Sequence, residues 1–170
     1  MKKSIISIAS GFIMISLLVS ISWAQESPPA SAEATIDGVT VKIDYHAPRV
    51  KGRTVWGGLV PYDMVWRTGA NNATTIELSD NVKIGNNKIP KGKYALFTIP
   101  KKGDTWTVII NKEAEQWGAY NYKESEDLVR FDVKVDRSLE ISEAMNFDAK
   151  DDGTVVFSWE YKTFSFSITK

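Results

Sequence analysis

A period-two alternation of apolar and polar residues along most of the chain limits the possible folds more than any other feature. It is clearest in 39–46, where Val39, Val41 and Ile43 share one face and polar residues occupy the other. Because the side chains of a β-strand alternate between two faces, this pattern predicts a strand with one buried face. Asp37-Gly38, just before it, is a typical hairpin turn. No long segment shows the 3.6-residue period of a helix.

A second long alternation covers 129–135 and 139–147, which we expect to form two further strands. Its apolar positions include Leu139 and Ile141, and we expect both to face the interior. The whole pattern suggests roughly nine short strands with turn signals about every 8–12 residues. It predicts an all-β fold, a single antiparallel β-sandwich that is jelly-roll-like. Two long irregular connections, 48–75 and 113–127, interrupt it.

The last predicted strand changes phase along its length. Its apolar positions are odd from 155 to 161 and even from 164 to 168. A one-residue slip moves every side chain of a strand to the opposite face of the sheet. The change therefore predicts a bulge or a bend near Lys162-Thr163.

Residues 1–24 have the pattern of a signal peptide. Lys2 and Lys3 precede an apolar run, and Ser22 and Ala24 are the small residues that signal peptidase reads. We expect cleavage after Ala24 and an exported protein, periplasmic or secreted. An uncleaved membrane anchor is the alternative, but several serines interrupt the apolar run. A lipid anchor is excluded because the chain has no cysteine to acylate.

The mature chain is expected to contain one domain, 33–170, after a polar lead-in at 25–32 that we predict to be disordered. The full chain carries 21 basic and 21 acidic residues. This balance gives no electrostatic reason to bind nucleic acid or an anionic membrane. The absence of cysteine excludes disulfides, thiolate metal ligands and cysteine nucleophiles.

The single histidine, His46, restricts the enzymatic possibilities. One histidine without cysteine cannot build a zinc site of the usual composition. A Ser-His-Asp triad with Asp44 is arithmetically possible, but no G-x-S-x-G motif presents a serine. Acidic residues are numerous, yet no spacing nominates a pair for glycoside hydrolysis. We therefore predict no catalytic residue, no metal site and no cofactor.

The first connection, 48–75, is the most unusual stretch of the chain, and it combines tryptophans, tyrosine and arginines with Gly, Pro and Asn. A second aromatic group lies at 117–122. Aromatic side chains on loops at one end of a sandwich would form a stacking platform, with arginine and asparagine supplying directional hydrogen bonds. The candidate ligand-binding residues are Arg53, Trp66, Arg67, Asn71, Trp117 and Tyr120.

A structural role for the same residues is the competing interpretation. Trp56 and Trp66 could close one end of the sandwich as part of its core. Arg67 would then stack on an aromatic ring or bind the carbonyl groups of its own loop. The sequence alone leaves both interpretations open.

The stretch 45–75 resembles the signature of an uncharacterised family of exported bacterial proteins, catalogued as a domain of unknown function. The matching residues read Y-x-x-P-x-V-K-G-R-x-V-W-G-x-L-V-P-Y-x-x-V-W-R-T-G-A-N-x-A-T-T. Counterparts of 89–100 and of 111–120 extend the resemblance over nearly the whole mature chain. It implies an exported β-rich domain and supplies no reaction, ligand or catalytic residue.

Three functions follow as hypotheses. The first is a non-catalytic binding module for a small molecule, a glycan or an envelope partner, which uses the aromatic and basic connections. The second is a structural envelope domain whose signature only stabilises the fold. The third is an envelope hydrolase or lyase that uses carboxylates and Arg67.

Overall fold

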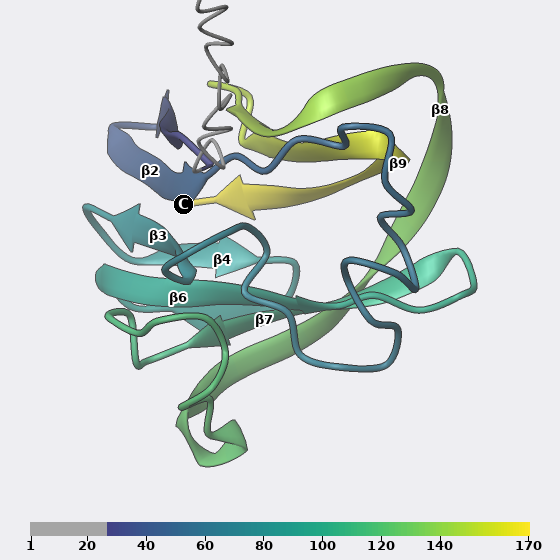
Figure 1. Ribbon diagram of the computed structural model, residues 1–170. Coiled ribbons are helices and arrows are strands. Elements are labelled where there is room, and N and C mark those ends of the chain that lie inside the picture. Colours follow the sequence, from purple (N-terminus) through teal and green to yellow (C-terminus); the bar gives the residue numbers. More distant parts are fainter. Residues whose placement is uncertain (1–26) are drawn as a thin grey trace, which may run out of the picture.

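The computed structural model describes residues 27–170 (Figure 1). The predicted signal peptide, 1–24, lies outside them. The described part is built from nine strands and one short 3-10 helix, η1. Their bounds are β1 Pro29–Ile36, β2 Val39–His46, β3 Thr74–Leu78, β4 Val82–Ile84, β5 Asn87–Ile89, β6 Gly92–Ile99, β7 Thr105–Asn111, η1 Glu124–Glu126, β8 Asp127–Ala149 and β9 Thr154–Thr169.

All neighbouring strands pair antiparallel, in the order β1-β2-β3-β6-β7-β8-β9-β4-β5. The two long strands fold this sheet over on itself. The first part of β8 pairs with β7, and its second part pairs with β9. In Figure 1, β8 curves from the layer of β6 and β7 to the layer of β9. The prediction of an all-β, sandwich-like fold is confirmed.

The bend of β8 and β9 explains the phase change in the last strand. The pairing register of the two strands shifts between Arg137 and Ser142 and again before Asn146. Opposite this irregularity, Glu160 has a left-handed backbone with φ of 55°. Phe157 before it and Phe164 after it are both buried. The chain thus makes the predicted bend close to the predicted place, and both halves of β9 face the core.

Three sequence predictions were wrong, two about this region and one about the N-terminus. Leu139 is fully exposed and Ile141 is 49% exposed, because they lie in the irregular part of β8 where the pairing register shifts. The two strands expected there are one strand of 23 residues. The lead-in predicted to be disordered also differs, since β1 begins at Pro29 and pairs with β2 from there.

The core between the layers is strongly aromatic. Trp56, Trp66, Trp106 and Trp159 pack together, and the rings of Trp66 and Trp159 stack with centroids 5.7 Å apart. Trp106 and Trp159 are completely buried. Large aromatic side chains remove much apolar surface from water, which suits a small domain without disulfides.

Candidate functional site

The connection 47–73, between β2 and β3, spans the two layers of the fold. Near its start, Val50 N–H donates to Glu143 O of β8, and Met145 N–H donates back to Pro48 O. Near its end, Trp66 exchanges two backbone hydrogen bonds with Thr98 of β6. Because it is anchored on both layers, this connection is an ordered cap rather than a loose loop.

The second connection, 112–126, lies against the first. Asn72 and Trp117 form a β-bridge, Ala73 N–H donates to Gln116 O, and Gly118 N–H donates to Asn71 O. Gly118 has a φ of 64°, a left-handed conformation that a glycine adopts without strain. The two irregular connections therefore meet, as a binding platform at one end of the sandwich would require.

A cavity of about 500 Å³ lies where the connections meet, against the tryptophan cluster. Four of the six candidate residues line it: Arg53, Trp66, Arg67 and Tyr120. The rest of the described lining is mostly apolar and consists of Ser27, Pro48, Leu59, Val60, Pro61, Met64, Val65, Gly69, Ala70, Ala119 and Trp159. We call it the Arg67 cavity.

Arg67 is the most unusual polar group of this cavity. Its side chain is half-buried, and its Nε is buried without a hydrogen-bond partner among the described residues. Burial lowers the pKa of the guanidinium below its ordinary value. A buried donor without an acceptor costs about 1–3 kcal/mol, so proteins rarely leave one in this state. Trp159, also in the lining, has a buried indole Nε1 in the same condition within residues 27–170.

Arg53 differs from Arg67 because part of its guanidinium is bound by the protein. Its Nε donates to Val50 O and its Nη2 donates to Arg49 O. Arg53 thus has the loop-stabilising role that the structural interpretation assigned to Arg67. It still adds positive charge at the edge of the cavity.

Trp66 belongs both to the core and to the cavity. It is only 7% exposed, and it contacts Trp56, Phe157 and Trp159 edge-on or by stacking. The hydroxyl groups of Thr68 and Thr74 bind the turn that follows it: Thr68 Oγ1 donates to Trp66 O and Thr74 Oγ1 to Thr68 O. These hydrogen bonds tie down the turn that carries Arg67.

The other candidate residues lie around the junction of the connections. Tyr120 is 83% exposed at the cavity rim, whereas Trp117 is 58% exposed and does not line the cavity. Asn71 is half-buried and accepts a backbone hydrogen bond from the second connection. Sequence reasoning missed Met64 and Trp159 as lining residues. Met64 had no distinguishing signal, and the alternation of the last strand assigned Trp159 to the core without indicating that a cavity reaches it.

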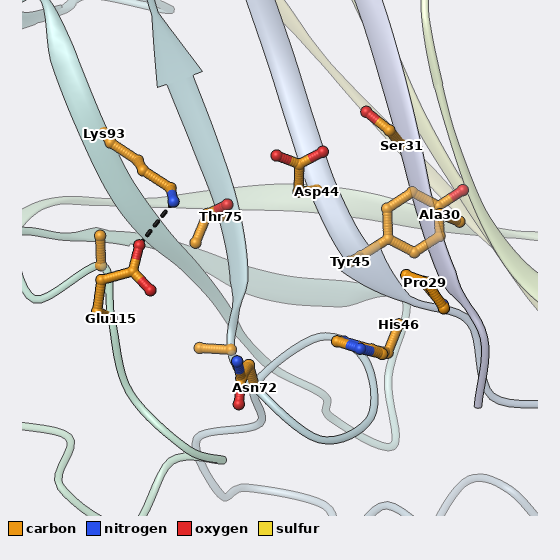
Figure 2. Close-up of a pocket in the computed structure, with 12 residues that line it drawn as sticks. Pro29, Ala30, Ser31, Asp44, Tyr45, His46, Asn72, Thr75, Lys93 and Glu115 are labelled. Carbon is orange, nitrogen blue, oxygen red and sulfur yellow. Dashed lines mark hydrogen bonds and ion pairs between the residues drawn. The ribbon is translucent and has the colours of Figure 1, made fainter. Parts of the chain in front are cut away.

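A second cavity, of about 480 Å³, lies on the outer face of β1, β2, β3 and β6 (Figure 2). Its polar side chains come from neighbouring strands and include Asp44, His46 and Lys93. The ion pairs here are complete: Lys93 Nζ lies 2.6 Å from Glu115 Oε1, and Asp44 is 2.9 Å from Lys42 Nζ. Burial acts to raise the pKa of Asp44, but hydrogen bonds from Lys42 and Ser31 outweigh it and hold the pKa below its ordinary value.

The arrangement of this outer cavity does not favour a catalytic triad. A triad needs the histidine between the serine and the carboxylate. Figure 2 shows His46 directed toward Asn72, while Ser31 lies on the other side of Asp44. Ser31 is the cross-strand neighbour of Asp44, and no described contact joins it to the imidazole.

A third polar group is a closed network under the second connection. The carboxylate of Asp127 accepts hydrogen bonds from Tyr122 Oη, Arg130 Nε and Asn111 Nδ2. Burial first, and then Asp127, raises the pKa of Tyr122 to about 12. Arg130 also lies 3.3 Å from Glu124. These charges bind one another, and they hold the second connection to β7 and β8.

Two searches of residues 27–170 gave negative results. They contain no group of three or more His, Asp or Glu residues placed to hold a metal ion. Within the same residues, no helix has the length and apolar character needed to cross a bilayer.

Comparison with known proteins identifies a family but no characterised relative. The family model described as "Protein of unknown function (DUF2911)" matches residues 27–168, which is most of the chain and all of both connections. No curated protein and no solved structure matches the sequence. The chain therefore belongs to this family of domains of unknown function.

Proposed function

We propose that this protein is an exported, non-catalytic binding module that holds a small molecule in the Arg67 cavity. One observation carries the proposal: Arg67 Nε is buried in the cavity wall without a hydrogen-bond partner in the described chain. A bound ligand would supply the acceptor that the fold does not supply. The N-terminal signal-peptide pattern is what supports export.

The shape and lining of the cavity support a small-molecule ligand. A volume of about 500 Å³ falls within the range of about 300–1,000 Å³ that is usual for such sites. Small-molecule sites combine apolar and aromatic walls with a few directional polar groups. Here Leu59, Met64 and Trp66 provide apolar walls, and Arg67 provides the directional group.

The structural hypothesis is favoured for one residue of the signature. Trp66 is packed into the aromatic core, so its main contribution is to the stability of the fold. Arg67 has no such explanation, since none of its side-chain atoms makes a described hydrogen bond or ion pair. The signature thus combines a residue that supports the fold with a residue that faces a ligand.

The hydrolase or lyase hypothesis has less support from this cavity. Such an enzyme would need carboxylates near Arg67. Among the described residues that line the cavity, none is acidic. We therefore place binding ahead of catalysis.

A ligand screen with matched arginine variants tests the proposal. The mature protein, Arg67→Met and Arg49→Met are compared by thermal shift against organic acids, neutral glycans and peptidoglycan fragments. Arg49 is an exposed arginine of the same connection and lies outside the cavity lining, so Arg49→Met is the matched control. A ligand at about 100 times its Kd stabilises by about 2.7 kcal/mol. We expect a rise of about 5–10 °C in Tm for the mature protein and Arg49→Met, and none for Arg67→Met.

The contrary result is equally clear. If no ligand class shifts Tm, and Arg67→Met unfolds several degrees below Arg49→Met, Arg67 serves the fold and the binding proposal fails.

A further inference from the structure

We infer that the ligand of the Arg67 cavity is a small organic acid, whose carboxylate binds Arg67 and whose apolar body lies along Leu59 and Met64. This inference rests on the proposed binding function and adds the chemical class of the ligand. Three features of the cavity lead to it: its charge, the free donors of its arginines and its apolar wall.

Within residues 27–170, the charged side chains that line the cavity are all positive. Arg53 and Arg67 line the cavity, and no acidic side chain does so within residues 27–170. By contrast, Arg130 elsewhere in the fold has Asp127 and Glu124 within ion-pair distance. An opposite charge near a half-buried guanidinium offsets its desolvation, so an anionic ligand fits this cavity.

The donors that remain free favour a carboxylate over a phosphate. No guanidinium nitrogen of Arg67 makes a described hydrogen bond, and the planar fork of a guanidinium matches the two oxygens of a carboxylate. In Arg53, Nε and Nη2 already donate hydrogen bonds to the carbonyl groups of Val50 and Arg49. A dianionic phosphate is usually held by several donors, often from a glycine-rich loop or a helix N-terminus. The lining contains one arginine without described partners and one whose Nε and Nη2 are already bound, which suits a single negative charge.

The apolar wall indicates that the acid carries an apolar group. Leu59 is 45% exposed and Met64 is 61% exposed, although both line the cavity. Covering such side chains with an apolar group of the ligand removes apolar surface from water, which favours binding. A neutral sugar is a poorer match because it presents hydroxyl donors, and no described lining side chain is a carboxylate or an amide that would accept from them.

Pairs of acids and their neutral amides test this inference. The probes are acetate, hexanoate, 3-phenylpropanoate and indole-3-acetate with the four corresponding amides, and phenyl phosphate. Binding to the mature protein, Arg67→Met, Arg67→Lys and Arg49→Met is measured by titration calorimetry. The intensity of tryptophan fluorescence gives a second readout, because Trp66 and Trp159 line the cavity.

We expect at least one of the larger acids to bind the mature protein at least tenfold more tightly than its amide, and more tightly than acetate. Arg49→Met should keep this preference, and Arg67→Met should reduce it to within about threefold, since the charged hydrogen bonds to the acid are lost. Arg67→Lys keeps the charge but loses the fork, so its preference should lie between the two. Near-UV circular dichroism of each variant verifies that the core is intact.

Negative results can overturn either the ligand class or the binding function itself. Amides that bind as tightly as their acids, or a phosphate that binds more tightly than every acid, would overturn the inference about the ligand class and leave the binding function standing. A neutral ligand found in the broader screen, with no acid bound, would have the same meaning. If neither the probes nor the screen gives any ligand, the binding function itself fails.

Discussion

Two cavities of this protein have nearly the same volume but differ in whether their charges are paired. The outer cavity, of about 480 Å³, contains charges that are paired within the protein, Lys42 with Asp44 and Lys93 with Glu115. The Arg67 cavity, of about 500 Å³, contains a guanidinium that no described residue pairs. The two cavities are therefore alike in volume and differ in the pairing of their charges.

The contrast arises from the secondary structure that builds each recess. The outer cavity lies mainly on regular strands. Lys42 and Asp44 are two residues apart on one face of β2, and Lys93 of β6 reaches Glu115 of the second connection. The Arg67 cavity lies between irregular connections, whose side chains have no such regular partners. A ligand can therefore compensate a charge in the second recess, whereas in the first it would have to displace a partner.

The largest expected loss of stability concerns Trp66, which lines the Arg67 cavity. Trp66→Ala should lower the free energy of unfolding by about 3–5 kcal/mol, because it removes a large buried ring from the tryptophan cluster. Urea denaturation measures it. Trp117→Ala is the control, because Trp117 is 58% exposed and its loss should cost less than about 1 kcal/mol. Equal losses of unfolding free energy in the two variants would show that Trp66 does not contribute to the core.

A smaller loss of stability is expected when Arg130, which has ion-pair partners, is compared with Arg67, which has none among the described residues. Arg130→Met should lower the free energy of unfolding by about 1.5–3 kcal/mol, because Asp127 would lose its charged donor. Arg67→Met removes a half-buried cation that has no described partner, so stability should change by less than about 0.5 kcal/mol or rise slightly. Both are measured by urea denaturation. A loss at Arg67 as large as that at Arg130 would mean that Arg67 has a structural partner.

The smallest expected loss of stability concerns an ion pair of the outer cavity. Lys93→Met breaks the pair with Glu115, whose two side chains are 41% and 76% exposed. Exposed ion pairs contribute about 0–1 kcal/mol, and we expect a loss within that range by urea denaturation. Binding of the acid probes should be unchanged. If this variant abolished acid binding instead, the outer recess would be the ligand site and the comparison would be reversed.

The sequence predicted the fold well where the chain is regular. The alternation at 39–46 and the phase change after residue 161 both correspond to the observed strands and to the bend near Glu160. Prediction failed at Leu139 and Ile141, which continue the alternation but are exposed. Alternation indicates which side chains share a face, but a shift in pairing register decides whether that face has a partner layer.

The candidate site was predicted in part. The concentration of aromatic and basic residues led to Arg53, Trp66, Arg67 and Tyr120, which line one cavity. Their individual roles did not follow from residue type. Arg53 binds its own loop while Arg67 faces the cavity, because only the path of the backbone places the Val50 and Arg49 carbonyl groups beside one of them.

By itself, the sequence determined that this protein is an antiparallel β domain without cysteine, with two irregular connections that concentrate its unusual residues. These properties follow from local periodicity and composition, which need no knowledge of distant contacts. Only the tertiary structure decided that the two connections meet, that Trp66 belongs to the core, and that Arg67 lies beside the cavity without a described partner. Pairing and burial depend on residues far apart in the chain, and they therefore emerge only when the sheet folds over itself.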